Sequence, residues 1–250
     1  MDNYTAKGIK LPKTRLGLVK MNKLLDAAEE LFTNNGFHST SISDICKKAD
    51  TAVGTFYIYF ETKTDVYRYL MWKYERRIKE LLAESIKNCK TRYEMEREGI
   101  KCFIKFALQN PTVYNIIWGS LSIDQSLFSD YYNSFAESYT KALKRSENEL
   151  CVSDAKTVAY MLMGISNFVG LRAIFEDLND EQIDLLVNET IMPALSEGIF
   201  KNCEKKTKNG EKRVLSVCFF VLCVNLTTCS EFLLTFHTTY SIMALDGISL

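Results

Sequence analysis

The residues whose types and spacing suggest a chemistry lie between positions 51 and 63, in the stretch TAVGTFYIYFETK. Small side chains come first, and a small leading edge lets a helix backbone approach the major groove of DNA closely. Hydroxyl, phenol and ammonium groups follow, and such groups bond base edges or phosphate oxygens. The stretch therefore predicts that a short helix contacts double-stranded DNA.

The same sequence offers little material for catalysis or for binding a metal or other cofactor. Its two histidines are His38 and His237, and its eight cysteines show no CxxC and no ligand spacing that includes histidine. Paired carboxylates and a phosphate-binding loop are also missing from the pattern, so we expect neither an enzyme nor a cofactor. Dispersed thiols without a signal peptide fit the reducing cytoplasm. A redox switch through Cys89, Cys102 or Cys151 remains an alternative.

Two further helices are expected around the short one. Apolar residues repeat with a 3.6-residue period at Leu24, Leu25, Ala28, Leu31 and Phe32. Gly36 follows where a helix end favours positive φ. Ser41 and Asp44 have the spacing of a capping box, and Thr62 and Asp65 repeat that spacing before a longer helix. Helices in this order form a helix-turn-helix, in which one helix enters a groove and two others brace it.

This segment resembles the DNA-binding domain of the TetR family over about 45 residues. The matching residues are Ala27-Ala28, Leu31-Phe32, Gly36-Phe37, Thr40, Ile42, Asp44-Ile45, Ala49, Gly54-Thr55-Phe56-Tyr57, Tyr59-Phe60 and Lys63. The rest of the chain is similar to the family only in length and helical layout. The resemblance implies a homodimer, an N-terminal three-helix reader, and a larger helical domain whose small-molecule effector releases the DNA.

By position, the resemblance also implies a set of DNA-contacting residues. They are Thr40, Thr51, Ala52, Val53, Gly54, Thr55, Tyr57, Tyr59 and Lys63. The Thr40 hydroxyl and nearby backbone N–H groups would hold a phosphate. Tyr57 and Lys63 match positions that touch the DNA backbone, whereas residues 53–55 face the bases. Tyr59 would reach either the DNA backbone or a base. Alternatively, Tyr57 and Tyr59 form only the aromatic floor of the small domain.

Three residues depart from the family pattern. Asp50 occupies a turn position usually held by Gly, and it tolerates left-handed conformations less freely. Ala52 replaces a hydroxyl cap, a loss that typically costs about 1 kcal/mol unless Thr51 or Asp50 caps instead. Val53 replaces a commonly polar residue, which removes one hydrogen-bonding base contact. We expect modest affinity from a reader that is still competent.

Composition points to a folded protein with one local excess of positive charge. The 250 residues are 47% apolar, enough for one large core and a small satellite domain, and the formal net charge is zero. Residues 1–23 nevertheless hold six cations against Asp2 alone. A flexible basic arm ahead of the first helix is expected to follow phosphates or enter the minor groove. The alternative is an arm that serves only solubility.

From Lys63 onward the pattern remains helical. A helix over 63–88 would be roughly 39 Å long and would connect the reader to the larger domain. Further helices are expected over 94–109, ending at Asn110-Pro111, and over 113–118, 123–150, 153–177 and 180–200, the last bent at Pro193. The predicted fold is all-α, an N-terminal three-helix domain followed by a helical bundle.

Aromatic residues crowd the middle of the chain, and they are either packed core or the wall of an apolar pocket. The candidates for such an effector pocket are Phe103, Phe106, Trp118, Phe135, Tyr139, Phe168 and Arg172. Arg172 would orient an anionic ligand, or it would pair with Glu176 at i+4. We therefore expect a small apolar or aromatic effector as a partner.

The last two helices of the larger domain carry the residues expected at a two-fold interface. These are Met161, Gly164, Ile165, Phe168 and Leu171, then Ile183, Leu186, Ile191, Ala194 and Leu195. Family members pair the equivalent helices as a four-helix bundle. A two-fold dimer implies a near-palindromic operator with half-sites matched to the helical repeat of DNA.

The C-terminal segment has a different composition. All 31 Lys and Arg lie at or before residue 213, and residues 214–230 form an uncharged, largely apolar stretch. A basic flank before such a stretch is typical of a membrane anchor, although 17 residues is at the short limit and Asn225 dilutes it. A helix docked on the larger domain is an alternative.

Together these patterns predict three regions: a reader over 1–62, an effector and dimer domain over 63–203, and an atypical tail over 204–250. The predicted function is a cytoplasmic, sequence-specific transcription regulator, a repressor that a small effector releases. The alternative is a ligand- or protein-binding module with impaired DNA reading, tethered to a membrane through the tail.

Overall fold

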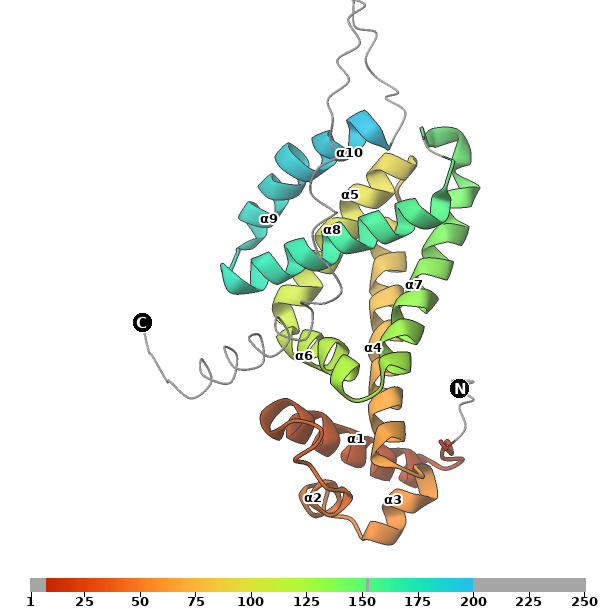
Figure 1. Ribbon diagram of the computed structural model, residues 1–250, viewed down its shortest axis with the longest axis vertical. Helices are drawn as coiled ribbons and strands as arrows, with labels where there is room; N and C mark the ends of the chain where they lie inside the picture. Colours follow the sequence, from red (N-terminus) through yellow and green to blue (C-terminus); the bar gives the residue numbers. More distant parts are fainter. Residues whose placement is uncertain (1–7, 152, 200–250) are drawn as a thin grey trace, which may run out of the picture. The chain divides into compact units, whose positions relative to one another are not determined.

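The computed structural model describes residues 8–151 and 153–199, which form helices joined by short loops (Figure 1). Among these residues, strand-like pairing is limited to one isolated antiparallel bridge between Ile9 and Phe60. The all-α prediction is therefore confirmed. The expectations for the apolar stretch 214–230 and for the start of the basic arm, residues 1–7, lie outside the described residues.

The reader consists of α1 (Arg15–Asn35), α2 (Ile42–Lys48) and α3 (Val53–Tyr59), followed by the connecting helix α4 (Lys63–Ile86). Both predicted capping boxes are present: Ser41 with Asp44 begins α2, and Thr62 with Asp65 begins α4. Gly36 ends α1 with a φ of 79°, as its position predicted. Local hydrogen bonding thus fixes where three of these four helices begin or end.

The first helix begins at Arg15, nine residues before the apolar repeat starts at Leu24. Thr14 caps α1 by accepting a hydrogen bond from the backbone N–H of Gly17, 3.1 Å away. The expectation of a flexible arm up to residue 23 is therefore wrong for residues 15–23. Three of the apolar residues in this first part, Leu16, Leu18 and Val19, are exposed and lie off the repeat, whereas Met21 is buried and extends it.

The larger domain contains α5 (Arg92–Gln109), α6 (Pro111–Gly119), α7 (Gln125–Arg145) and α8 (Ala155–Phe175), with one-turn 3₁₀ helices after α6 and α7. Then come α9 (Asp180–Leu186), a π-helical turn (Val187–Ile191) and α10 (Met192–Gly198). The predicted break at Asn110-Pro111 is present. The expected bend at Pro193 takes the form of this π turn, because proline lacks the N–H of a regular helix and its ring crowds the carbonyl of residue i−4.

Two hydrophobic cores hold these helices together. The first joins the reader to the larger domain, since Leu24, Phe56 and Phe60 belong to the same buried cluster as Leu70 and Ile116. The second lies among α5, α7, α8, α9 and α10. Helix α8 packs against both α5 and α7 (Figure 1). By length and composition alone, α8 is the one described helix apolar enough to cross a membrane, and its packing explains part of that apolar character.

Candidate nucleic-acid interface

Helix α3 presents one face to solvent and anchors the other in the reader's core. Val53 is 44% exposed and Tyr57 is 52% exposed, whereas Phe56 is fully buried. Gly54 is also exposed, and a Cβ placed on it would meet no atom within 4 Å. The predicted small leading edge is therefore open, and a groove wall can approach it without obstruction from the protein.

Two residues that depart from the family pattern, Asp50 and Ala52, shape the turn into α3. Asp50 adopts the left-handed conformation that the turn requires, with a φ of 52°. Ala52 occupies the N-cap position, and no side chain caps α3. Neither Thr51 nor Asp50 takes over that role; Thr51 is half-buried, and its backbone N–H bonds to Cys46 O at 3.0 Å. The helix that faces solvent therefore begins without the usual side-chain support.

The Thr40 hydroxyl is used inside the protein, which corrects the expectation that it holds a phosphate. Thr40 is only 2% exposed, and its Oγ1 donates to the carbonyl oxygen of Gly36 at 2.8 Å. The hydroxyl therefore supports the end of α1, and Ser41, the next residue, caps α2. The spacing of Ser41 and Asp44 predicted this cap, whereas the sequence did not indicate that the neighbouring Thr40 hydroxyl bonds Gly36.

Lys63 lies where the resemblance placed it, at the first position of α4, but its side chain points back into the reader. Its Nζ donates to the carbonyl oxygens of Phe37 and Thr40 and lies 4.2 Å from the centre of the Phe37 ring. Partial burial lowers the pKa of this ammonium. An ammonium has three N–H donors, so at most one remains for a phosphate.

Tyr59 also serves packing, in agreement with the aromatic-floor alternative. It is 6% exposed, and its carbonyl oxygen accepts a hydrogen bond from the backbone N–H of Lys10 at 2.8 Å. A Cβ on Gly17 would lie 3.3 Å from the Tyr59 hydroxyl, so the start of α1 lies closely against this ring. Tyr57 has no such role, because half of its surface is exposed. The two tyrosines therefore divide between packing and the open face.

The reader contacts the larger domain through an aromatic group and one hydrogen bond, and a second hydrogen bond joins α4 to α6. The rings of Phe32 and Phe37 lie 5.4 and 5.5 Å from that of Tyr67 on α4. The Tyr67 hydroxyl donates to the carbonyl oxygen of Ile116 on α6, and burial raises the pKa of this phenol, which keeps it protonated. His38 Nε2 lies 3.3 Å from the carbonyl oxygen of Ser122. The orientation of the reader is thus coupled to α4 and α6.

The residues predicted to line an effector pocket do not gather around one cavity in the described residues. Phe106 is buried in the first core, and the Phe135 ring packs 5.1 Å from that of Tyr131. The Trp118 ring lies 6.4 Å from that of Phe168, which is itself 64% exposed. Aromatic packing, the alternative stated above, accounts for most of this set.

Two polar members of that set have partners within the protein. The Tyr139 hydroxyl donates to Glu96, and Glu96 also pairs with Arg92, whose Nε is 2.7 Å from Oε1. Both charged side chains are buried, so this group holds α5 against α7. Arg172 is exposed and bonds Glu176 at 3.0 Å, which is the i+4 pair that the sequence offered as the alternative. Neither Tyr139 nor Arg172 lines either of the two clefts along α4.

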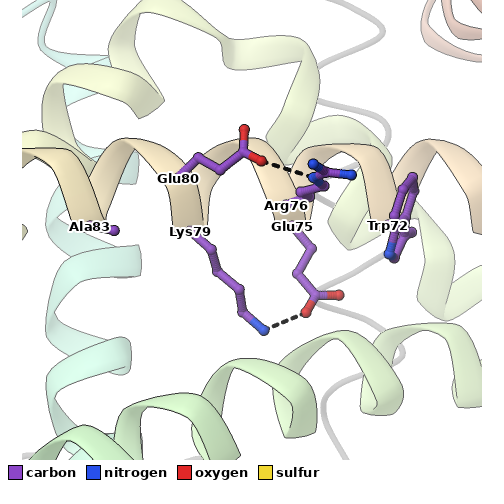
Figure 2. Close-up of a pocket in the computed structure, with 6 residues that line it drawn as sticks. All are labelled: Trp72, Glu75, Arg76, Lys79, Glu80 and Ala83. Atoms are coloured by element: carbon purple, nitrogen blue, oxygen red, sulfur yellow. Dashed lines mark hydrogen bonds and ion pairs between the residues drawn. The ribbon is translucent and has the colours of Figure 1, made fainter. Parts of the chain in front are cut away.

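Two open clefts lie along α4. One, of about 380 Å³, is lined by α4 alone; Figure 2 shows Lys79 and Glu75 pointing toward one another beside it. The second, of about 470 Å³, lies between α4, α5 and α9, with Leu81 and Phe106 as its apolar lining. Lys101 and Asp184, two other lining residues, pair across this second cleft at 3.3 Å. In each cleft, charged lining side chains therefore pair with one another.

One face of α8 is apolar and exposed. Met161, Phe168 and Phe175 are 46%, 64% and 56% exposed, and they recur every seven residues. Gly164 lies on the same face with open space around it. The second set of residues predicted at the two-fold interface needs correction. Ile183, Ile191 and Leu195 are buried in the core of the chain itself. On α9 the exposed apolar residue is Leu185, at 63%.

Comparisons with known proteins agree with this architecture. Residues 24–70 match the model for bacterial regulatory proteins of the tetR family. Over 53 residues the chain is 51% identical to the HTH-type transcriptional regulator YvdT of Bacillus subtilis, covering 21% of this chain and 26% of that protein. Over 173 residues it is 23% identical to the HTH-type transcriptional regulator QacR of Staphylococcus aureus, covering 66% and 91%. The solved fatty acid degradation regulator FadR from Bacillus halodurans has a TM-score of 0.59 at 18% identity, covering 74% and 96%.

Proposed function

We propose that this chain, a TetR family transcriptional regulator, is a homodimeric repressor that leaves a near-palindromic operator when a small apolar or aromatic molecule binds its larger domain. The open face of α3 is the observation that carries the proposal. Its exposed residues are small at the leading edge and include one phenol, a combination suited to groove reading with backbone contact.

Dimerisation is supported by the exposed face of α8. Apolar residues at 161, 168 and 175, with Gly164 between them, form a seven-residue repeat of the kind that pairs helices. An exposed apolar surface on one helix is typical of an interaction site. Two copies paired through this face would present two α3 helices to successive major grooves, provided that their spacing matches one DNA turn of about 34 Å.

Release by an effector is supported by the contacts between the reader and the larger domain. Tyr67 on α4 bonds α6, and its ring contacts Phe37 of the reader. A ligand that displaces α4 or α6 would therefore reorient α3. A shift from mostly bound to mostly free needs a ligand that prefers the released state by about 5 kcal/mol. The Bacillus halodurans protein is named a fatty acid degradation regulator, which adds fatty acids to the effectors worth testing.

Binding to DNA is the direct test. Purified chain should prefer the duplex upstream of its own gene over random duplex at physiological salt, and Thr55→Ala should change base preference at a cost of about 1–3 kcal/mol. Equal affinity for both duplexes would instead favour the second candidate, a ligand- or protein-binding module. The absence of a side-chain cap on α3 is the observation that motivates this alternative.

A further inference from the structure

The segment that precedes α1 is fastened to the reader beside α3. The backbone N–H of Lys10 donates to Tyr59 O at 2.8 Å, and the backbone N–H of Glu61 donates to Gly8 O at 3.0 Å. Ile9 and Phe60 face one another in the resulting antiparallel bridge. This part of the arm is therefore held at the C-terminal end of α3.

A glycine makes this attachment possible. Gly8 has a φ of 91°, and a Cβ on it would lie 2.7 Å from Asp65 Oδ2. The Asp65 carboxylate is buried, and its partners are within the protein: it caps α4 through Thr62 and pairs with Arg68 at 2.6 Å. The arm thus crosses directly over the start of α4, in a conformation and at a distance that a larger residue would not permit.

The arm is basic, and its cations face outward. Residues 8–14 hold Lys10 and Lys13 and no carboxylate, and Arg15 follows as the first residue of α1. Ile9 packs against the first core; since successive residues of an extended chain point to opposite sides, Lys10 faces solvent. Lys13 and Arg15 are also exposed, and within the described part of the chain Lys10, Lys13 and Arg15 form no ion pair. Of the eleven cations that do form ion pairs in the described residues, by contrast, seven find a carboxylate within four positions of the chain.

Resting on the proposed function, we infer that Lys10 and Lys13 bind the DNA phosphates that flank each half-site. Helix α3 has seven residues, which is roughly 10 Å at 1.5 Å per residue, and the major groove is about 12 Å wide. Groups at the end of such a helix therefore lie beside a wall of the groove, where the phosphates are. The arm adds contacts to the DNA backbone. The Thr40 and Lys63 side chains supply such contacts only weakly, because both donate hydrogen bonds to carbonyl oxygens within the reader.

The inference predicts a change in salt dependence. For full-length Lys10→Ala/Lys13→Ala bound as a dimer, four phosphate contacts are lost, and the slope of log K against log salt falls in magnitude by roughly 3 to 4, at about 0.9 per contact. The probes are the duplex upstream of the gene and a random duplex. The loss should be equal on both, because phosphates carry no sequence information.

A matched control removes the same charge far from α3. Lys141 and Lys144 are exposed near the end of α7, and Lys141→Ala/Lys144→Ala should keep the wild-type slope. Gly8→Ala keeps every charge but displaces the arm. Its slope of log K against log salt should therefore lie between those of wild type and Lys10→Ala/Lys13→Ala. Circular dichroism and thermal melting verify that each variant is folded.

The outcomes separate this inference from the proposed function. If wild type prefers its upstream duplex and Lys10→Ala/Lys13→Ala keeps the wild-type slope, the arm inference is wrong and the proposed function stands. An equal loss in the Lys141→Ala/Lys144→Ala control would attribute the effect to net charge and also overturn the inference. A loss confined to the upstream duplex would indicate base contacts instead of phosphates. Failure of wild type to prefer its upstream duplex would reject the proposed function itself.

Discussion

Replacing Lys63 with methionine should destabilise the reader more than it weakens contact with phosphates. Methionine keeps most of the apolar stem and removes the ammonium, which now bonds the carbonyl oxygens of Phe37 and Thr40. A hydrogen bond from a charged donor contributes about 1.5 kcal/mol at the low end, and the contact with the Phe37 ring contributes about 0.5 kcal/mol. Because Lys63 is only half-buried, water can replace part of this loss. We expect Lys63→Met to lower the free energy of unfolding by about 2 kcal/mol.

Hydrogen exchange and salt-dependent binding, measured on the full chain, distinguish the two roles. Amides over 36–41, including the Thr40 N–H that bonds Phe37 O, should exchange faster in Lys63→Met. Since at most one N–H of Lys63 remains free, the salt slope should fall by no more than about 0.9 per protomer. Lys47→Met is the matched control, because Lys47 is exposed on α2 and has no ion pair in the described residues. Unchanged stability and exchange in Lys63→Met, together with a lower salt slope, would refute the structural role.

Three further outcomes follow from the packing and the caps. Gly170→Ala should destabilise the protein by about 1–3 kcal/mol in chemical denaturation, since its Cβ would lie 2.6 Å from the Tyr114 hydroxyl; an unaltered midpoint would contradict this packing. Phe168→Glu should convert the dimer to a monomer in analytical ultracentrifugation, because it places a charge in the exposed α8 face, and a persistent dimer would exclude that face. Bonding to Ser41 holds the pKa of Asp44 below its ordinary 3.8, so the stability it adds is present above that pH and is lost as the pH falls through the lower, folded value. Ser41→Ala should reduce this acid-dependent loss, because the Ser41 hydroxyl is removed while the backbone N–H of residue 41 still donates to Asp44, and helix content followed in an acid titration would show it.

Features fixed by neighbouring residues were predictable from the sequence. The capping boxes at Ser41 and Thr62, the positive φ of Gly36 and the break at Pro111 each depend on side chains within four positions. A pattern of residue types carries that information, because the partners are close in the chain. The order of the helices and the all-α class followed from such signals.

Features fixed by distant partners were not predictable in the same way. Lys63 bonds residues 23 and 26 positions earlier, and the Tyr139 hydroxyl bonds a carboxylate 43 positions away. Periodicity shows that a side chain turns inward, but it does not identify the group that the side chain meets. This is why the sequence leaves open whether the aromatic residues of the larger domain form packed core or a pocket wall, and why it does not predict the arm's attachment at Gly8. In the sequence, the available signals were the residue types alone: a glycine at position 8, which permits positive φ, and a threonine at position 14, which can cap a helix.

The uncapped start of α3 has a thermodynamic consequence. The backbone N–H groups of Val53 and Gly54 begin the helix without a side-chain acceptor, and the helix has only seven residues. Its first turn should therefore open readily in the free protein, and association with a duplex would order it. Complex formation should then show a more negative heat capacity change and a larger entropic penalty than rigid docking of the same surface. Calorimetry across several temperatures would read out how much of recognition is local folding.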